Sequence, residues 1–272
     1  MTVAGVRIFL FNIFFYSFTF TVAMVLWAVA RLSTRTAMHR VLRLWGGVVR
    51  GAVRHLLGGR IEVRGRENLP KDRPVLLVSK HQSELDIVMV ACLFPDVSAV
   101  AMEELTRYPF FGPILRKLDV VMVAVDSGPQ GRTRQVVSGA RRVIGEGRSM
   151  LIYPEGELMK LGARERYRRG VGHIYAELGV EVVPMANSLG AIWPQRRWRK
   201  CLDRTGAVEF LEPIGPGLPL DTFMAEVETR IETATMRLIR EHASGDDLAA
   251  AEDRYARRAN NDDEPVVACG TA

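Results

Sequence analysis

The sequence predicts an α/β fold in which a mixed central sheet is flanked by helices, with an N-terminal membrane-embedded helical segment ahead of it. The membrane segment is residues 8–30, which carry no charge and would reach about 30 Å as a helix. From about residue 60, short apolar runs alternate with stretches of helical periodicity, which is the pattern of an α/β layer structure. A composition of 48% hydrophobic and 25% charged residues is typical of a packed chain rather than a disordered one.

The segment 8–30 is expected to be a retained membrane anchor. It is longer than the core of a secretory signal, the competing interpretation, and is followed by Arg31 and Leu32 rather than by small residues of a cleavage site. Residues 1–60 contain eight arginines and no Asp or Glu, and seven of these arginines follow the apolar run. The positive-inside rule therefore predicts an inner or plasma membrane location with the α/β domain facing the cytoplasm. Residues 35–57 resemble a basic amphipathic helix lying on anionic headgroups, with an ordinary surface helix as the alternative.

Within the rest of the chain, apolar runs predict strands and longer periodic stretches predict helices. The predicted strands are residues 60–65, 74–80, 97–102, 119–125, 150–156, 180–186 and 207–214. The predicted helices are residues 83–94, 131–146, 171–178 and 221–242. Residues 108–113 are rich in turn formers, and residues 259–272 lack periodicity, as in a loose tail. The predicted organisation is an anchor and basic helix (1–58), an α/β domain (59–245) and a C-terminal tail (246–272), with no internal repeat.

Charge and cysteine content exclude several classes of partner. The net charge of +6 suits nucleic acid, anionic lipid or an anionic substrate, so the position of the charge must decide. No nucleic acid partner is expected, because no recognition helix or aromatic stacking motif accompanies the basic runs. Cys92, Cys201 and Cys269 are far apart and odd in number, which argues against a disulfide framework and against a zinc site. The absence of a glycine-rich nucleotide loop argues against a bound organic cofactor.

The segment from Ser79 to Asp86 lies where a predicted strand ends and a helix begins, a place where α/β proteins expose functional groups. Ser83 is a good N-cap, and Asp86 falls three residues later at the capping-box position. His81 can then fold back onto Asp86, whose carboxylate fixes the imidazole tautomer and raises its basicity. The other ring nitrogen is left to take a proton from a hydroxyl, as a general base does. The alternative is a structural histidine beside a routine capping box.

Four sequence blocks carry a resemblance to a known family. The run KHQSELD (80–86) resembles the first motif of the lysophosphatidate acyltransferase family, the 1-acyl-sn-glycerol-3-phosphate acyltransferase-like glycerolipid acyltransferases. Residues 100–112 are similar to its second block, Tyr-Pro-Glu-Gly (153–156) to its Pro-Glu-Gly block, and Val-Val-Pro-Met (182–185) to its final strand-proline block. The four blocks occur in the family's order, which makes the resemblance specific.

The resemblance implies a membrane-bound enzyme that transfers a fatty acyl group to a hydroxyl of a lysophospholipid. The implied acceptor is most simply 1-acyl-sn-glycerol-3-phosphate, giving phosphatidic acid. The thioester co-substrate would be carried by acyl carrier protein (ACP) or coenzyme A (CoA), and the implied partners are this carrier, the lysolipid and membrane lipid, with no cofactor or metal. His81 would be the base and Asp86 its orienter.

The resemblance also implies a substrate-binding region, to which Lys80, Ser83, Glu155 and Gly156 are assigned. Glu155 and Gly156 follow an apolar strand, so their turn should reach the same sheet edge as His81. Backbone N–H groups of this turn could there stabilise an oxyanion. The alternative is a simple strand-to-loop turn.

The chain departs from the family pattern where the family carries positive charge near the acceptor phosphate. It has Met102 and Val125 in place of a lysine and an arginine, and Glu157-Leu158 where the family carries an arginine after Glu-Gly-Thr. Each lost contact should weaken phosphomonoester binding by about 1.5 to 3 kcal/mol. Replacement charge is expected from a downstream run, with Arg168 or Arg169 as the best candidate and a solvated or lipid-binding basic loop as the alternative. The run consists of Arg164, Arg166, Arg168 and Arg169.

Other interpretations of the sequence remain beside the main one. A second basic run interleaved with tryptophans is interpreted as an interfacial belt. It consists of Trp193, Arg196, Arg197, Trp198, Arg199 and Lys200. Ser83 is not in a Gly-x-Ser-x-Gly elbow, which argues against a serine hydrolase, and His173 is interpreted as structural. The alternative functions are the same chemistry on another lysolipid, such as lyso-ornithine lipid, and a non-catalytic membrane scaffold with the acyltransferase fold.

Overall fold

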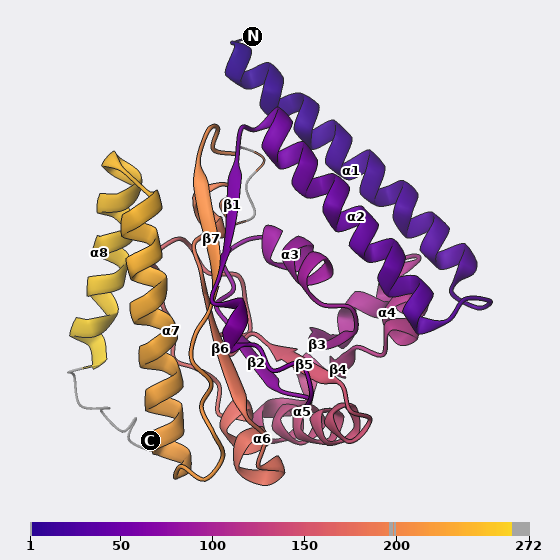
Figure 1. Cartoon of the computed structure of the whole chain (residues 1–272), viewed down its shortest axis with the longest axis vertical. Coiled ribbons are helices and arrows are strands. Elements are labelled where there is room, and N and C mark those ends of the chain that lie inside the picture. Colours follow the sequence, from indigo (N-terminus) through magenta and orange to yellow (C-terminus); the bar gives the residue numbers. More distant parts are fainter. Residues whose placement is uncertain (1, 196–197, 199, 263–272) are drawn as a thin grey trace, which may run out of the picture.

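The computed structural model describes residues 2–195, 198 and 200–262 of the 272-residue chain and has a seven-stranded sheet at its centre (Figure 1). The strands are β1 (Arg60–Arg64), β2 (Leu76–Ser79), β3 (Val97–Met102), β4 (Val121–Val123), β5 (Ser149–Ile152), β6 (Val182–Asn187) and β7 (Thr205–Phe210). The α-helices are α1 (Val3–Val29), α2 (Arg35–Leu56), α3 (Leu85–Leu93), α4 (Phe111–Leu118), α5 (Gly128–Gly145), α6 (Gly170–Leu178), α7 (Leu220–His242) and α8 (Gly245–Asp262). Short 3-10 helices are η1 (Arg66–Asn68), η2 (Glu103–Arg107), η3 (Val125–Ser127) and η4 (Leu189–Ala191). The predicted fold class is confirmed.

The sheet is mixed, with the strand order β1-β7-β6-β2-β5-β3-β4. All neighbouring strands are parallel except β6 and β7, and β7 lies between β6 and the edge strand β1. Central strand β2 pairs with β5 and β6 in the same direction, with Val78 opposite both Ile152 and Pro184. The carboxyl ends of these three strands therefore meet at one edge, and the segments that follow β2 and β5 are neighbours.

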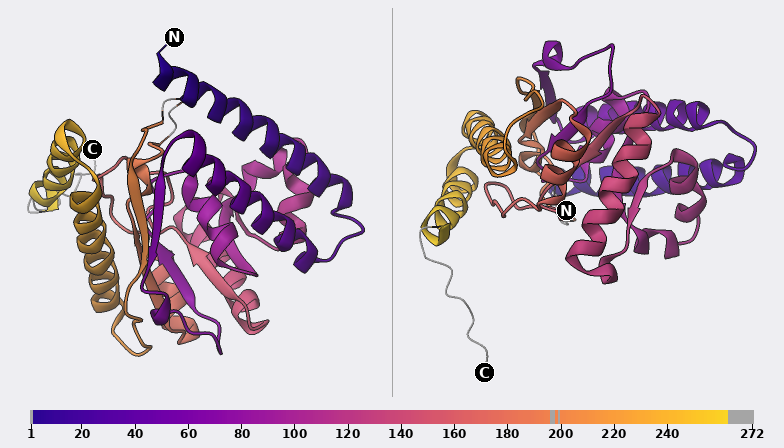
Figure 2. Two further views of the ribbon diagram at one scale, coloured as in Figure 1. Left: turned by 45° about the horizontal axis from the view of Figure 1, so that its top comes forward. Right: turned by 90° about the horizontal axis from the view of Figure 1, so that it is seen from below.

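Two apolar cores lie on opposite faces of the sheet, and β2 contributes to both. Leu77 belongs to the core shared with α2 and α3, whereas Leu76 and Val78 belong to the core shared with α5, α6 and α7. All four residues of β2 are buried, which explains why its sequence is a continuous apolar run rather than an alternating one. Figure 2 shows α7 and α8 on the opposite side of the sheet from α1 and α2.

Helices α1 and α2 form an antiparallel hairpin beside α3 (Figure 1). Of the described helices, α1 alone is long and apolar enough to cross a membrane. It is nevertheless attached to the domain, because Arg7 pairs with Asp203 at 3.0 Å and buried Phe11 packs edge-on against Trp193 at 5.4 Å between ring centroids. The predicted basic helix is confirmed as α2, but its apolar stripe is buried in protein. The stripe consists of Met38, Trp45, Val49 and Val53, so only the outer, basic side of α2 remains for a membrane.

The prediction of a tail from residue 246 is wrong for residues 246–262, which form helix α8. Its apolar face is narrow and consists of Leu248, Ala251 and Tyr255, which pack against the end of α7. Because this face contains few large apolar residues, the sequence shows little of the hydrophobic periodicity that predicts a helix. Helix α8 approaches the loop before α6 so closely that a Cβ at Gly162 would collide with the backbone of Ala251. The α/β domain therefore extends to residue 262, and residues 263–272 of the predicted tail lie outside the described residues.

Helix α4 was also missed by the sequence analysis. The turn-rich segment 108–113 leads directly into it, with Phe110 in a backbone conformation of φ 72° just before the first helical residue. Pro113 occupies the first turn, where a helix tolerates proline because the N–H groups there have no intrahelical partner. The turn signals were correct, but they marked the start of a helix rather than a loop between strands.

Candidate active site

The loop between β2 and α3 carries His81 and has a fixed backbone. The N–H of Lys80 donates to the carbonyl of Met185 on β6 at 3.1 Å, and the carbonyl of Lys80 accepts from the side-chain amide of Asn187 at 2.7 Å. The carbonyl of His81 accepts from the N–H of Met159 at 2.7 Å. Bonds on both sides of the peptide that joins Lys80 to His81 therefore hold the imidazole at the carboxyl edge of the sheet.

His81 and Asp86 meet as the sequence predicts. Nδ1 of His81 lies 2.8 Å from Oδ2 of Asp86, and the same oxygen accepts from the backbone N–H groups of Gln82 at 2.8 Å and Ser83 at 3.1 Å. The side chain of Asp86 is 3% exposed and that of His81 15%. Among the described residues, none hydrogen-bonds Nε2 of His81. This nitrogen is thus the one available to a substrate proton.

Ser83 has a different role from the one the sequence predicts. Asp86 does reach back to the N–H of Ser83, as in a capping box, but the Ser83 hydroxyl donates to the carbonyl of Trp193 at 2.8 Å and accepts from the N–H of Leu85 at 3.1 Å. The residue is fully buried. The assignment of Ser83 to substrate binding is therefore corrected, because both bonds of its hydroxyl hold the loop in place.

Tyr153, at the end of β5, covers one face of the imidazole. Its ring is stacked on His81 with 3.9 Å between centroids and 16° between planes. Burial, and then the nearby Asp86 carboxylate, raise the pKa of Tyr153 well above its usual value, so the phenol stays neutral. Sequence reasoning missed this contact. The available signal was its place directly before Pro-Glu-Gly and directly after a strand that is parallel and adjacent to β2.

Glu155 lies beneath the β2–α3 loop that carries His81 rather than on the surface of that loop. Oε2 accepts from the backbone N–H of His81 at 3.1 Å, and Oε1 is 2.5 Å from the ammonium of Lys80. The residue is 4% exposed. The prediction that the turn after β5 reaches His81 is confirmed, but the assignment of Glu155 to substrate contact is corrected, because both of its carboxylate oxygens face protein groups.

Lys80 requires a similar correction. Its side chain is fully buried, and its ammonium donates to Glu232 on α7 at 2.8 Å and to the carbonyl of Ala163 at 2.9 Å, besides pairing with Glu155. Burial disfavours the charged form, but Glu232 and Glu155 outweigh it and hold the pKa of Lys80 above its usual value. Lys80 is charged and directed into the protein, so in this structure it does not reach a substrate.

Gly156 and Arg168 lie together at the surface of the same turn. Gly156 has φ 76°, and a Cβ there would collide with the guanidinium of Arg168. The N–H of Gly156 donates to the carbonyl of Tyr153 at 3.1 Å, which closes the turn. The hypothesis that backbone N–H groups of this turn stabilise an oxyanion therefore does not apply to the N–H of Gly156. The backbone of Arg168 is held by the carbonyl of Pro154 at 2.9 Å, and its side chain is exposed.

Two other arginines of the run, Arg164 and Arg169, point elsewhere. Arg169 pairs with Asp221 at the start of α7 at 2.6 Å. Arg164 donates to the carbonyl of Tyr255 on α8 at 3.2 Å and lies 4.3 Å from the centroid of its ring. Of the two arginines predicted as best candidates, the structure places Arg168 at the Pro-Glu-Gly turn and commits Arg169 to α7.

Two of the three positions that lack the family's positive charge, Met102 and Val125, are exposed and apolar, and the third carries the exposed, acidic Glu157. Met102 ends β3 and Val125 follows β4, and their exposed fractions are 49% and 45%. Residues 102 and 123 are partners in the pairing of these two strands, so the two positions lie at the same sheet edge. This edge is the one from which His81 and the Pro-Glu-Gly turn emerge.

The predicted interfacial belt is only partly supported. Trp193 is 1% exposed and belongs to the core, with the Lys200 ammonium 4.3 Å from its ring centroid. Trp198 is 55% exposed and stacks on Tyr16 of α1 at 5.7 Å. Arg196, Arg197 and Arg199 lie outside the described residues. Trp193 is therefore corrected from an interfacial to a core residue, whereas Trp198 lies beside the apolar helix.

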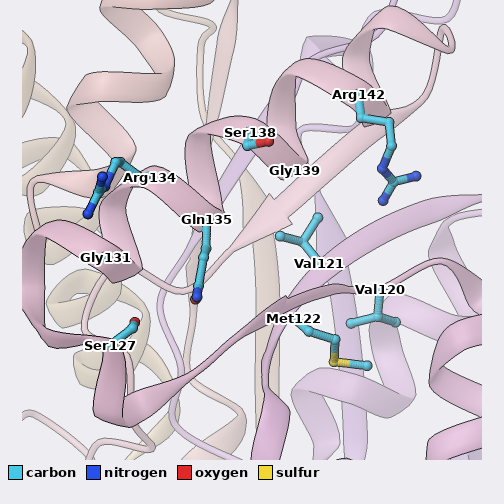
Figure 3. Close-up of a pocket in the computed structure, with 10 residues that line it drawn as sticks. All are labelled: Val120, Val121, Met122, Ser127, Gly131, Arg134, Gln135, Ser138, Gly139 and Arg142. Carbon is cyan, nitrogen blue, oxygen red and sulfur yellow. The ribbon is translucent and has the colours of Figure 1, made fainter.

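A surface hollow of about 720 Å³ lies between β4 and α5 (Figure 3). It is lined by side chains such as Val121, Gln135 and Arg142, and none of its lining residues belongs to the His81 loop or the Pro-Glu-Gly turn. The hollow is therefore separate from the candidate active site. Over the part of the chain that the structure describes, no group of three or more His, Cys, Asp and Glu side chains is arranged to hold a metal ion.

Buried Glu155 gives a testable pH dependence. Burial raises its pKa to about 7, against the opposing effect of Lys80. As pH rises from about 4.5 to about 7, the unfolded chain loses this proton while the folded protein keeps it, so Glu155 makes stability fall across that window and adds no slope above it. We expect the melting temperature of Glu155→Gln, measured in detergent, to fall less steeply than that of wild type between these pH values. Parallel curves for the two proteins would contradict this prediction.

Comparison with known proteins places the chain in a family. The family model described as Acyltransferase matches residues 60–188. A 1-acyl-sn-glycerol-3-phosphate acyltransferase of Pseudomonas aeruginosa is 30% identical over 201 residues, which cover 73% of this chain and 77% of the relative. The 1-acyl-sn-glycerol-3-phosphate acyltransferase alpha of Homo sapiens is 28% identical over 138 residues, 50% of this chain and 48% of the relative.

A solved structure shares the fold. The crystal structure of the 1-acyl-sn-glycerophosphate acyltransferase PlsC from Thermotoga maritima superposes with a TM-score of 0.70 over 86% of this chain and 97% of that one, at 21% identity. The family match covers all four sequence blocks, and its range contains both His81 and Asp86. The chain is thus an acyltransferase and belongs to the 1-acyl-sn-glycerol-3-phosphate acyltransferase family.

Proposed function

We propose that the protein transfers a fatty acyl group from a thioester to the free hydroxyl of 1-acyl-sn-glycerol-3-phosphate, giving phosphatidic acid. The observation that carries this proposal is the 2.8 Å pairing of His81 Nδ1 with Asp86, which leaves Nε2 open at the sheet edge. The relative from Pseudomonas aeruginosa is named for this activity. The intact pair argues against a non-catalytic scaffold.

In the proposed reaction, Nε2 of His81 takes the hydroxyl proton of the lysolipid as its oxygen attacks the thioester carbonyl carbon. The tetrahedral intermediate then breaks its carbon–sulfur bond, and the leaving sulfur receives the proton from the imidazolium. The products are an ester and a free thiol. Asp86 stabilises the imidazolium while it lasts and keeps Nδ1 protonated throughout, because Oδ2 can only accept.

Arg168 is the proposed contact for the acceptor phosphate. Its guanidinium covers Gly156 at the turn beside His81, and within the described chain no carboxylate pairs with it. Gly156 has no side chain, so the guanidinium can lie directly on the turn. This arrangement supplies one positive charge near a sheet edge where Met102 and Val125 supply none.

A matched pair of substitutions tests this role. Arg168→Gln should raise KM for lysophosphatidate about tenfold, since one charge-assisted contact is worth about 1.5 kcal/mol or more. Arg169→Gln, which removes a neighbouring exposed arginine already paired with Asp221, should change KM less than about twofold. Initial rates over a range of lysophosphatidate concentrations give both values. Equal effects of the two substitutions would assign the whole run to general surface charge.

The exposed apolar positions favour a second candidate, in which the acceptor is another lysolipid such as lyso-ornithine lipid. Met102 and Val125 form an apolar rather than a basic rim beside the site. An acceptor without a phosphomonoester would lose little from their lack of charge. In that case Arg168→Gln should leave KM for the preferred lysolipid unchanged.

The donor is proposed to be acyl-ACP or acyl-CoA. Both present the same thioester to His81, so the reaction at the carbonyl carbon is the same for either carrier. The choice between them depends on contacts outside the His81–Asp86 pair.

The protein is proposed to associate with the membrane through α1, lying in the interface rather than crossing it. Near its start α1 is tied to Asp203 through Arg7, and near its end Trp27 packs on Phe110 at 5.3 Å, so both ends are held by one domain. Its large exposed side chains can enter lipid. They include Phe9, Leu10, Ile13, Phe20 and Val25. The cytoplasmic face remains the prediction of the positive-inside rule.

The experiment that tests the proposed function is acyl transfer by the purified protein in detergent. Lysophosphatidate, lyso-ornithine lipid and a neutral lysolipid are each supplied with acyl-ACP and with acyl-CoA, and the acylated product is quantified. Formation of phosphatidate from lysophosphatidate at the highest kcat/KM is the expected result. Transfer only to lyso-ornithine lipid would select the second candidate, and no transfer to any acceptor would overturn both.

A further inference from the structure

Four buried polar side chains lie next to the β2–α3 loop that carries His81, which we call the catalytic loop, and are linked to one another. The ammonium of Lys80 is 2.5 Å from a carboxylate oxygen of Glu155 and 2.8 Å from Oε1 of Glu232. The hydroxyl of Tyr167 donates to the same Oε1 at 2.9 Å. None of the four side chains belongs to a residue more than 4% exposed. They form what we name the buried network.

The buried network joins segments that are distant in sequence. Through Glu155 it holds the backbone N–H of His81 at 3.1 Å, and through Lys80 it holds the carbonyl of Ala163 at 2.9 Å. Tyr167 anchors the same segment four residues later, by its bond to α7. The loop that leads from the Pro-Glu-Gly turn to α6 is thus fixed at two points to the base of the catalytic loop.

Apolar side chains could fill this space at less cost. Burying two carboxylates and an ammonium removes their hydration, and apolar residues of similar volume often stabilise a protein as well or better. Leu76 and Val78, on the same face of β2, contribute to the core in that way. Lys80 therefore fixes the relative positions of the segments that it joins, because its hydrogen bonds form only when Glu155, Glu232 and the carbonyl of Ala163 are correctly placed.

From this arrangement we propose that Glu232 and Tyr167, which belong to none of the four sequence blocks, are positioning residues for acyl transfer. The buried network places His81 through Glu155, and it places Arg168 through the segment that ends at Tyr167. The proposal rests on the proposed function, in which His81 is the base and Arg168 contacts the acceptor phosphate.

The two connections predict separable kinetic effects. Tyr167→Phe keeps the ring but removes its hydroxyl bond to Glu232, which is one of the contacts that hold the segment before Arg168, while the bond between Glu155 and His81 remains. We expect KM for lysophosphatidate to rise about three- to tenfold, with kcat within about twofold of wild type. Glu232→Gln removes a charge that balances Lys80, so the ammonium is drawn toward Glu155. We expect this variant to lower kcat as well, and kcat/KM to fall about tenfold or more.

Each variant has a matched control in the same part of the fold. Tyr175→Phe removes another hydroxyl from the same core, one that donates to the carbonyl of Gly215 at 2.7 Å. Glu226→Gln removes a carboxylate of α7 that pairs with Arg230 on the helix surface. Neither control residue touches the buried network, so a change in stability alone should appear in controls and test variants alike.

The experiment measures kcat, KM and melting temperature for these four single variants, for Arg168→Gln, and for Tyr167→Phe combined with Arg168→Gln. If Tyr167 acts through Arg168, the double variant should have a KM no higher than about twice that of Arg168→Gln alone. Once the guanidinium of Arg168 is absent, the loss of the Tyr167 hydroxyl has no phosphate contact left to misplace.

The proposal is overturned if Tyr167→Phe and Glu232→Gln lower the melting temperature like their controls but leave kcat and KM within about twofold of wild type. Should Glu232→Gln not fold, Tyr167→Phe and the double variant decide. Failure of the proposed function is recognised separately, because the wild type would then not acylate lysophosphatidate. The same variants would in that case be compared on the lysolipid that the wild type does acylate, and absence of any transfer would overturn both proposals.

Discussion

His81→Gln should lower kcat/KM for acyl transfer by at least about 10³-fold, or about 4 kcal/mol in the barrier. Glutamine is similar in size and can still donate toward Asp86, but its amide cannot take a proton from a hydroxyl near neutral pH. The acceptor oxygen would then have to attack the thioester with no base at position 81 to take its proton. The measurement is initial-rate acyl transfer at saturating donor, with the melting temperature recorded for the same preparation.

The control for this variant is His173→Gln. His173 is exposed on α6 and takes no part in the His81–Asp86 pair, so its replacement should leave the rate within about twofold of wild type. A folded His81→Gln protein that kept more than a tenth of wild-type activity would show that another group removes the proton.

Asp86→Asn should lower kcat/KM by about 10² to 10³-fold, or about 3 to 4 kcal/mol, even though the hydrogen bonds of the loop are retained. The His81 ring and the N–H groups of Gln82 and Ser83 all bind Oδ2, whereas Oδ1 is buried and has no hydrogen-bond partner among the described residues. An asparagine can place its oxygen at the Oδ2 position and keep the same three bonds. The negative charge that stabilises the imidazolium is removed, and the amide NH2 group takes the buried position of Oδ1.

This variant separates charge from orientation. The nitrogen chemical shifts of the His81 ring should report the same Nδ1-protonated tautomer in wild type and Asp86→Asn. A change of tautomer would attribute the lost rate to orientation, and a loss smaller than about tenfold would mean that the charge of Asp86 is dispensable.

Much of the candidate site could be predicted because its signals are local. The spacing of Ser83 and Asp86 is that of a capping box, and the structure shows Asp86 reaching back to the Ser83 N–H while it holds His81. The meeting of the His81 loop with the Pro-Glu-Gly turn follows from the rule that parallel strands share their carboxyl edge. These features depend on a few consecutive residues and on strand direction.

The direction of a side chain depends on distant elements and could not be predicted. Lys80 looks like a substrate ligand in the sequence because it precedes His81, yet its ammonium meets Glu232, 152 residues away on α7. Glu155 likewise turns inward because Lys80 is there to receive it. Tyr153 was missed because an aromatic residue at the end of an apolar strand is usually read as core.

Trp193 joins helix α1 to the loop that carries His81. The carbonyl of Trp193 accepts a hydrogen bond from the hydroxyl of Ser83 in the loop that carries His81. The indole of Trp193 is covered by Phe11 and Phe15 of α1. Helix α1 is thus linked through a single residue, Trp193, to the loop that carries His81. A shortened chain that starts at α2 would uncover that indole and loosen the loop that it supports. Detergents that compete for the inner side of α1 should inactivate the enzyme before they unfold it.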